Sequence, residues 1–309
     1  MNLSVVVCTF NRADSLGRTL RSFGALRLPP GFEWELLVVD NNSSDHTRRV
    51  VEDAAARLPA RYLFERRQGK SFALNAGVAA ARGDVIAFTD DDVTVDAGWA
   101  AALWRAFAEH SCVGVGGRVV PVWDGPRPRW YSETGPFRLM AGVIVRYEHG
   151  DAVRDVEVPP LGANLAFRRE AFARYGSFRT DLGPTGTELR RGEDTDFCER
   201  VRAGGEAILY VPDAVVYHPV EPMRVRKRYF QAWYYQYGRL EVRREPPPAG
   251  VARWWGVPRY LFRDLAGAAL RWIPALDPRV RFYYRLECCR HLGQIAESHR
   301  RAAGTAGSS

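Results

Sequence analysis

In Gly83-Asp84-Val85-Ile86-Ala87-Phe88-Thr89-Asp90-Asp91-Asp92, a short apolar run leads directly into three adjacent carboxylates. The run Val85–Phe88 is typical of a short buried strand. In an extended chain Asp90 and Asp92 point to one side and Asp91 to the other. Carboxylates this close repel one another, and a divalent cation that prefers oxygen ligands, such as Mg²⁺ or Mn²⁺, relieves the repulsion. The stretch therefore predicts a metal-phosphate site at a strand end, with a solvated acidic turn as the alternative.

Strands and helices alternate on both sides of this stretch. Besides the strand before the aspartates, we expect strands over 3–8, 34–39 and 61–65, with helices over 45–58, 71–81 and 99–110 and a further helix through Leu16, Leu20 and Phe23. This alternation predicts the α/β class, with a doubly wound, mostly parallel sheet flanked by helices. Ligands of such sheets bind at the carboxyl ends of the strands.

The rest of the chain is less regular. We expect a strand over 111–122, a loop over 121–136, a short apolar segment over 161–167, helices over 169–175 and 193–203, and strand-like segments over 208–211 and 214–218. The glycine-containing loop 183–192 is suited to act as a lid. We predict a nucleotide-binding domain over 1–221 and a mainly helical extension over 222–309, with a disordered tail from about 302.

Composition indicates an ordinary globular enzyme-sized chain. It has 309 residues, of which 46% are hydrophobic and 26% charged. No apolar run is long enough to span a bilayer, and the N-terminus lacks the basic leader of a signal peptide. The five cysteines have no metal-ligand spacing, so we expect a reduced, cytoplasmic setting; they stand at 8, 112, 198, 288 and 289.

Positive charge gathers in the extension. Residues 222–309 contain 17 Lys and Arg against 6 Asp and Glu, a net charge of +11, whereas 1–221 carries −3. The basic, aromatic stretches Arg224–Tyr237 and Arg259–Trp272 predict binding to an anionic membrane surface through 222–296. The alternative is that their aromatic rings pack inward and the arginines are solvated. We expect no nucleic-acid partner.

Polar side chains follow the other predicted strands. Thr9, Asn11 and Arg12 come after the first strand and Asp40 ends the second. An aspartate there is suited to accept hydrogen bonds from a nucleobase or a ribose hydroxyl, while Arg12 and Lys70 are suited to neutralise phosphate oxygens. The alternatives are turn chemistry for Thr9 and Asn11 and solvated surface charges for the two cations.

Two later features have both a catalytic and a structural interpretation. Gly192–Phe197 begins a helix in which Asp194 is either a cap or a base that takes a proton from an incoming hydroxyl. His218 follows the last apolar strand, and as a metal ligand it requires Asp92 to lie nearby in space.

Taken together, these motifs resemble family 2 glycosyltransferases of the GT-A fold. The resemblance covers roughly residues 3–220, and Cys8 replaces the proline that is usual before Thr9. Its motifs occur in the family's order: Val5–Arg12, Val38–Asn41, Gly69–Gly77, Phe88–Asp92, Gly162–Asn164 and Gly192–Asp194. Six ordered motifs are far more specific than any one of them.

The resemblance implies a role for each matched residue. Asp40 contacts the nucleobase, Asp90 the ribose, and Asp92 the metal that holds the diphosphate. Asp194 is the catalytic base, and His218 is a further metal ligand. The remaining nucleotide-sugar contacts fall to Thr9, Asn11, Arg12, Lys70 and Asp91, and contacts to the acceptor fall to Asn164 and Glu193.

The implied activity is that of an inverting hexosyltransferase that uses Mg²⁺ or Mn²⁺. Its donor is a nucleotide-diphosphate sugar and its acceptor a saccharide or lipid-linked saccharide, in cell-surface polysaccharide or glycolipid synthesis on the inner face of the cell membrane. A sugar-nucleotide nucleotidyltransferase is one alternative, although it needs a glycine-rich loop that Thr9–Arg12 lacks. A non-catalytic nucleotide-sugar-binding protein is the other.

Overall fold

The computed structural model describes residues 2–185, 192–248 and 250–306, which divide into two compact units. The first unit holds the described residues up to Val122, those from Val145 to Thr185, and Gly192–Pro219. The second holds Trp123–Ile144 and the residues from Val220 onward. The division after Pro219 lies close to the domain boundary expected at 221. The segment Trp123–Ile144 belongs to the second unit, whereas it was expected in the first domain.

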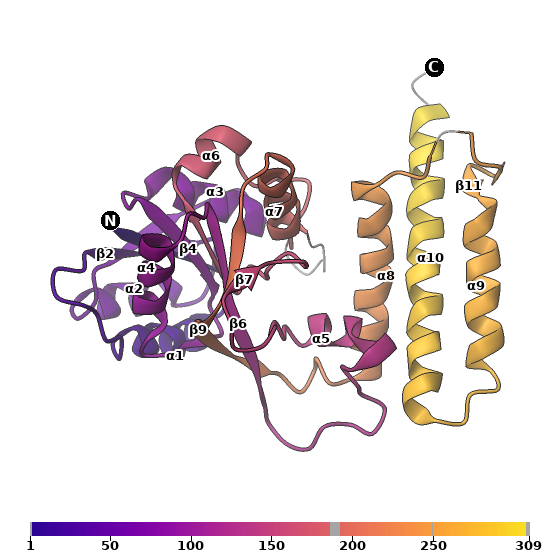
Figure 1. Ribbon diagram of the computed structural model, residues 1–309, viewed down its shortest axis with the longest axis horizontal. Coiled ribbons are helices and arrows are strands. Elements are labelled where there is room, and N and C mark those ends of the chain that lie inside the picture. The colour runs from indigo at the N-terminus through magenta and orange to yellow at the C-terminus, as the bar shows by residue number, and fades with distance from the viewer. Residues whose placement is uncertain (1, 186–191, 249, 307–309) are drawn as a thin grey trace. The chain divides into compact units, whose positions relative to one another are not determined.

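The parallel half of the central sheet carries the predicted strand–helix alternation, which is confirmed (Figure 1). Its strands lie in the order β3-β2-β1-β4 and all of these pairs are parallel. The elements are β1 (Leu3–Thr9), α1 (Ala13–Phe23), β2 (Trp34–Asp40), α2 (Thr47–Ala55), β3 (Ala60–Phe64), α3 (Lys70–Ala80) and β4 (Val85–Asp90). Strands β1, β2 and β4 are apolar and buried over nearly their whole length, as strands covered by helices on both faces are.

The sheet continues beyond β4 with antiparallel partners. The order is β4-β8-β6-β9-β5, and β7 pairs with β9. These elements are β5 (Thr94–Val95), α4 (Trp99–Glu109), β6 (Gly114–Trp123), β7 (Arg154–Asp155), β8 (Asn164–Arg168), α6 (Glu170–Tyr175), α7 (Glu193–Ala203) and β9 (Ile208–Val220). The expected α/β sheet flanked by helices is thus confirmed as a mixed one.

Strand β9 is one continuous strand where the sequence predicts two segments. Pro212 lies between residues 209–210, which pair with β7, and residues 216–217, which pair with β5. A residue in that position contributes no N–H to either of these two pairings, so the strand passes through it.

The second unit is helical. It contains the 3₁₀ turn Gly135–Phe137, α5 (Leu139–Val143), α8 (Lys227–Arg244), the short strands β10 (Arg253–Trp254) and β11 (Val257–Pro258), α9 (Arg259–Trp272) and α10 (Pro278–Ala306). Helix α10 packs against both α8 and α9 (Figure 1). It extends to Ala306, beyond residue 302, from about which a disordered tail was expected; residues 307–309 of that tail lie outside the described part of the chain.

Aromatic side chains form the core of the second unit. Phe230, Trp233 and Tyr234 of α8 are buried together with Phe282 and Leu286 of α10. For α8, then, the inward-packing interpretation of its aromatic rings holds. None of the helices in the described ranges combines the length and apolar character that a membrane span needs.

Candidate active site

The register of the parallel strands brings the predicted polar residues to one edge of the sheet. Thr9 lies opposite Asp40 on the neighbouring strand β2. On the other side of β1, Cys8 lies opposite Asp90 at the end of β4. The three strand ends therefore converge, as the rule for parallel sheets requires.

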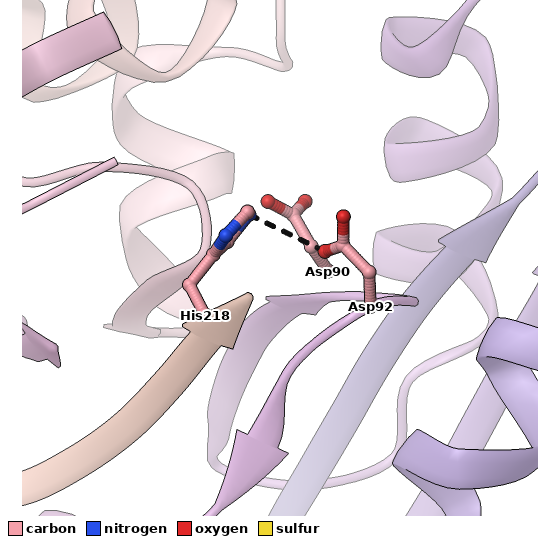
Figure 2. A group of neighbouring side chains, drawn as sticks. All are labelled: Asp90, Asp92 and His218. Carbon is pink, nitrogen blue, oxygen red and sulfur yellow. Dashed lines mark ion pairs between the residues drawn. The ribbon is translucent and has the colours of Figure 1, made fainter. Parts of the chain in front are cut away.

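Asp90, Asp92 and His218 form a compact group at this edge (Figure 2). Each offers one ligand atom, and these atoms all lie within 4.8 Å of one another. His218 comes from the far end of β9, and its Nε2 lies 3.4 Å from Oδ1 of Asp92. The spatial condition for His218 to act as a metal ligand is therefore met.

The hydrogen bonding of His218 suits a metal ligand. Its Nδ1 lies 2.9 Å from the carbonyl oxygen of Pro219, to which it can only donate. A neutral imidazole held in that way presents the lone pair of Nε2 to Asp92. Two electron-rich atoms then face each other, and both side chains are buried. A cation between them satisfies both, so the residues present fit a divalent metal ion.

Asp91 lies in the turn that follows β4, is not one of these three residues, and contacts side chains at and just after the end of β1. Its Oδ2 accepts a hydrogen bond of 2.7 Å from Oγ1 of Thr9, and its Oδ1 lies 3.5 Å from Nε of Arg12. Burial raises the pKa of Asp91 to about 7, although the charge of Arg12 opposes the rise. Arg12 also donates from Nη2 to Asp92 at 2.9 Å. It therefore bridges two of the three aspartates.

Lys70, at the start of α3, lies among the acids of the site. Its Nζ is 2.5 Å from Oδ1 of Asp90. Burial lowers the pKa of an ammonium group, but the negative charges of Asp90, Glu193 and Asp194 outweigh it, so the pKa of Lys70 is raised. Burial, together with the charge of Asp194, raises the pKa of the buried Glu193 to about 7. Lys70 thus connects the metal-ligand group electrostatically to the start of α7.

Asp40 and Asn11 shape the loops beside these acids. Asp40 accepts hydrogen bonds from the backbone N–H of Ser43 at 2.8 Å and from the Tyr62 hydroxyl at 2.7 Å. Asn11 adopts a φ of 51°, in the left-handed region that asparagine tolerates. Its Oδ1 accepts from the backbone N–H of Ser44 at 2.7 Å. The turn-chemistry interpretation of Asn11 therefore describes its contacts in this structure.

Asp194 lies in the first turn of α7 with its carboxylate held at both oxygens. Oδ2 accepts from the backbone N–H of Gly162 at 2.8 Å, and Oδ1 accepts from the backbone N–H of Thr195 at 2.8 Å. The first of these bonds reaches another segment of the chain, so the side chain does more than cap its own helix. Its orientation is set by two segments.

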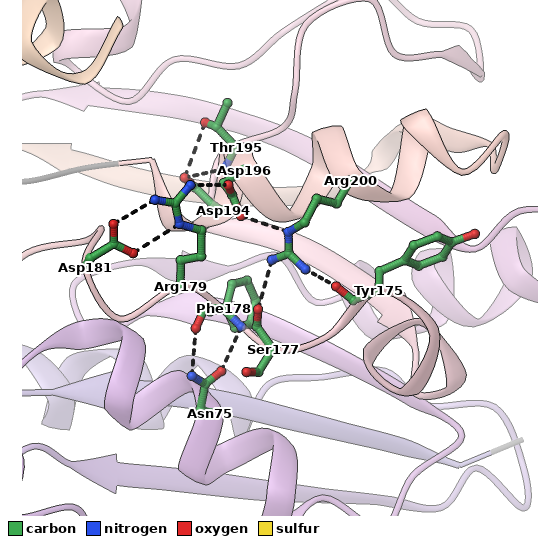
Figure 3. A network of polar contacts seen from close by, with 10 residues as sticks. All are labelled: Asn75, Tyr175, Ser177, Phe178, Arg179, Asp181, Asp194, Thr195, Asp196 and Arg200. Atoms are coloured by element: carbon green, nitrogen blue, oxygen red, sulfur yellow. Dashed lines mark hydrogen bonds and ion pairs between the residues drawn. The ribbon is translucent and has the colours of Figure 1, made fainter. Parts of the chain in front are cut away.

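The helix that carries Asp194 is tied to its surroundings by the polar network of Figure 3. Asn75 of α3 donates to the carbonyl oxygen of Phe178 at 2.8 Å and accepts from its N–H at 2.9 Å. Arg179 reaches Asp196 of α7 at 3.3 Å, and Arg200 of α7 donates to the carbonyl oxygen of Ser177 at 2.8 Å. Segment 177–179 thereby links α3 to the start of α7, which fixes the position of Asp194.

Asn164, predicted to contact the acceptor, has a structural role instead. It is fully buried, and its Oδ1 accepts from Nε1 of Trp99 at 2.9 Å. Its Nδ2 donates to the carbonyl oxygens of Arg118 and Ala214 at 2.9 and 2.7 Å. A Cβ at Gly117 would lie 2.2 Å from that amide nitrogen, so the strands close tightly around it. Both polar atoms of the Asn164 side chain are therefore engaged in contacts within the protein.

Sequence analysis missed several residues that support the site. Asn41 accepts from the backbone N–H of Gly69 at 2.8 Å and donates to the carbonyl oxygen of Arg67 at 2.7 Å, which fixes the loop before Lys70. Tyr62 and Asn75 were missed as well. Asn41 and Asn75 stand within the motifs Val38–Asn41 and Gly69–Gly77, whereas Tyr62 had no signal because its contact with Asp40 joins residues distant in sequence. Of the predicted lid 183–192, residues 186–191 lie outside the described part of the chain.

Comparison with known proteins adds a family and a fold. The family model described as "Glycosyl transferase family 2" matches residues 4–176. A glucosyl-dolichyl phosphate glucuronosyltransferase of Haloferax volcanii is 29% identical over 225 residues, which are 71% of this chain and 69% of that protein. The succinoglycan biosynthesis protein ExoM of Rhizobium meliloti is 27% identical over 302 residues, 96% of this chain and 92% of that one.

Solved structures of low sequence identity share the architecture. A mannosyltransferase from Pyrobaculum calidifontis, solved in complex with GDP-Man and Mn²⁺, has a TM-score of 0.59 at 19% identity. The match covers 100% of this chain and 75% of that one. At this identity the likeness establishes the fold.

Proposed function

The chain belongs to glycosyltransferase family 2, and from this we propose that it transfers a sugar from a nucleotide-diphosphate sugar to an acceptor hydroxyl, with inversion and with a divalent metal. Family membership makes it a glycosyltransferase, so the nucleotidyltransferase and the non-catalytic binding protein are set aside. The observation that most directly supports metal-dependent transfer is the convergence of Asp90, Asp92 and His218.

Asp90, Asp92 and His218 would hold the metal ion. Two carboxylates with one imidazole nitrogen suit Mn²⁺ better than Mg²⁺, which prefers an all-oxygen shell. When bound, the ion would stabilise the negative charge that develops on the departing nucleoside diphosphate. In this scheme Asp90 faces both the metal and the ribose, the contact inferred from family resemblance.

The cations of the site assist in holding the diphosphate. Lys70 is half-buried, and its charge is favoured by the acids around it; its Nζ lies 2.5 Å from Oδ1 of Asp90. Arg12 contacts Asp91 and Asp92, and a bound diphosphate would compete with these carboxylates for its guanidinium. Asp40, with Tyr62 orienting its carboxylate, supplies an acceptor for the nucleobase.

Asp194 serves as the base. The acceptor hydroxyl oxygen forms a bond to the anomeric carbon while the bond from that carbon to the diphosphate oxygen breaks, and the hydroxyl proton passes to Asp194. The backbone N–H groups of Gly162 and Thr195 keep the carboxylate aimed before the acceptor arrives. Glu193, buried beside it, remains a candidate for an acceptor contact.

The acceptor is proposed from the relatives' names and from the charge of the extension. One relative acts on a glucosyl-dolichyl phosphate and another takes part in succinoglycan biosynthesis. We infer a saccharide or lipid-linked saccharide acceptor, in cell-surface polysaccharide or glycolipid synthesis. The +11 charge of 222–309 is consistent with a peripheral position on the inner face of the cell membrane.

A donor screen tests the proposal. Hydrolysis and transfer are measured with a panel of nucleotide-diphosphate sugars and Mn²⁺, for the wild type and for Asp92→Ala and Asp194→Asn. We expect both variants to lose most transfer, while Asp194→Asn still binds the donor. Near wild-type turnover of Asp194→Asn would refute its role as base, and no turnover of any donor by the wild type would refute the function.

A further inference from the structure

Helix α9 of the second unit has two distinct faces. Leu261 and Ala268 are buried where α9 packs on α10. Apart from Tyr260 and Arg271, the exposed positions of α9 and its C-cap repeat every three or four residues, which places them on the side of the helix opposite the buried residues. They are Arg259, Arg263, Ala266, Leu270 and Ile273.

One end of this outward face is apolar. Leu270 and Ile273 are 71% and 72% exposed, and Leu276, in the corner between α9 and α10, is 96% exposed. That corner is ordered, because Oδ1 of Asp277 accepts from the backbone N–H of Arg279 at 2.7 Å and caps α10. Large aliphatic side chains are therefore presented to solvent by a fixed turn, an arrangement that marks a contact surface when the residues are contiguous.

The other end presents tryptophan from a strained hairpin. Trp255 is 80% exposed and has a φ of 49°, and the next residue, Gly256, has a φ of 78°. Two such residues between β10 and β11 form the turn in which asparagine and glycine are usual. A bulky residue held in the left-handed region is strained; such strain persists only where the surrounding structure imposes it, and strained residues cluster at functional sites. The carbonyl oxygen of Trp255, 3.0 Å from Nδ1 of His299, ties the hairpin to α10.

Positive charge lies between and around the two apolar ends. Residues 251–281 contain six arginines and two aspartates, a net charge of +4. Asp264 pairs with Arg263 and Asp277 pairs with Arg279. In the described part of the chain no ion pair joins the other four arginines to a carboxylate; they are Arg253, Arg259, Arg271 and Arg281.

We propose that this surface, made of the outward face of α9, the hairpin tryptophans 254–255 and Leu276, docks on an anionic lipid membrane. The helix is about 20 Å long at 1.5 Å per residue, so the surface is an extended stripe. Tryptophan and aliphatic residues enter the apolar boundary at its two ends, while the long arginine side chains reach the phosphates. Such a stripe fits a membrane surface, in which negatively charged phosphates lie above apolar acyl chains.

The proposal rests on the proposed function, in which a lipid-linked saccharide is one of the two acceptor classes, and it narrows the membrane contact expected from 222–296. The aromatic stretch of α8 is removed from that contact, because Phe230, Trp233 and Tyr234 lie in the core of the second unit. The stripe lies within 253–276.

Vesicle co-sedimentation of the full-length protein tests the stripe. Vesicles of phosphatidylcholine are used alone and with about 30% phosphatidylglycerol, a strongly anionic surface. The wild type is compared with the triple variant Leu270→Ser, Ile273→Ser, Leu276→Ser. We expect the wild type to bind the anionic vesicles and not the neutral ones, and added salt to weaken this binding. The partition coefficient of the triple variant should be at least about tenfold lower than that of the wild type. The matched control Val122→Ser, Val153→Ser, Val158→Ser changes exposed valines of the first unit and is expected to bind like the wild type.

A second variant and a separate readout complete the test. Arg259→Gln with Arg271→Gln is expected to reduce the salt dependence of vesicle binding and leave the melting temperature unchanged. Equal binding by all variants, equal binding to neutral vesicles, or capture of a protein through the stripe in place of vesicles would overturn the proposal. Donor binding is measured on the same samples. A wild type that binds anionic vesicles but no donor would refute the proposed function. A wild type that binds a donor but no vesicles would refute the docking surface.

Discussion

The positioning of Asp194 is tested most sharply by Gly162→Ala. The backbone N–H of Gly162 donates to Oδ2 of Asp194 at 2.8 Å, and alanine retains that donor. What changes is the added methyl group. A Cβ built at residue 162 would lie 3.2 Å from the same oxygen and 3.7 Å from Cβ of Asp194.

The expected effect follows from that distance. A contact of 3.2 Å is a few tenths of an ångström too short, so the carboxylate must move by about that much. A misplacement of about 1 Å costs on the order of a hundredfold in rate, so we expect turnover to fall by roughly tenfold. Donor affinity should stay unchanged, because Gly162 contacts the base and not the diphosphate-binding cations.

The assay is single-turnover transfer, with donor affinity measured separately. Gly267→Ala is the matched control, since nothing lies within 4 Å of a Cβ there and α9 is far in sequence from the base. Unchanged transfer by Gly162→Ala would refute the view that the oxygens of Asp194 are held in their working position. A fall in donor affinity equal to the fall in rate would assign Gly162 to donor binding.

Three further predictions concern other polar groups. Burial alone would raise the pKa of Glu297, but hydrogen bonds from Arg300, Arg243 and Arg239 lower it from 4.5 to about 2. The stabilisation that ionised Glu297 gives the folded state is therefore present above pH 4.5 and lost as pH falls toward 2. Glu297→Gln should lower the free energy of unfolding, measured with urea, by about 3 kcal/mol at pH 7. An equal decrease at pH 7 and at pH 2 would contradict this prediction. Asn164→Ala should lower the free energy of unfolding by about 3 kcal/mol, because it leaves a buried indole N–H and two carbonyl oxygens without their partner. A decrease below about 1 kcal/mol would argue against the structural role of Asn164. Tyr62→Phe removes the 2.7 Å bond to Asp40 and should weaken donor binding about fivefold by calorimetry, whereas unchanged affinity would remove Asp40 from the nucleotide contact.

The parallel half of the sheet was predictable because its strands are continuous apolar runs. Strands such as β1 and β2 are buried on both faces, and buried parallel strands have this composition. The antiparallel half gave weaker signals. Strands β5 and β7 are two residues long, too short for any periodicity, and Pro212 interrupts the pattern of β9.

The site divides in a similar way. Thr9, Asp40 and Asp90 were predictable as neighbours because all three end parallel strands. The proximity of His218 to Asp92 was not, since it depends on antiparallel pairings that the sequence does not reveal. The burial of Asn164 was not predictable either, because a motif match gives no information about burial.

The most direct test of the metal-dependent site is calorimetry of donor binding with and without Mn²⁺, for the wild type, Asp92→Asn and His218→Gln. Thermal melts without metal show that each variant is folded. The arrangement of Asp90, Asp92 and His218 predicts that Mn²⁺ tightens donor binding by the wild type and that both variants lose this gain. Donor affinity that is the same with and without Mn²⁺ in the folded wild type would contradict the account.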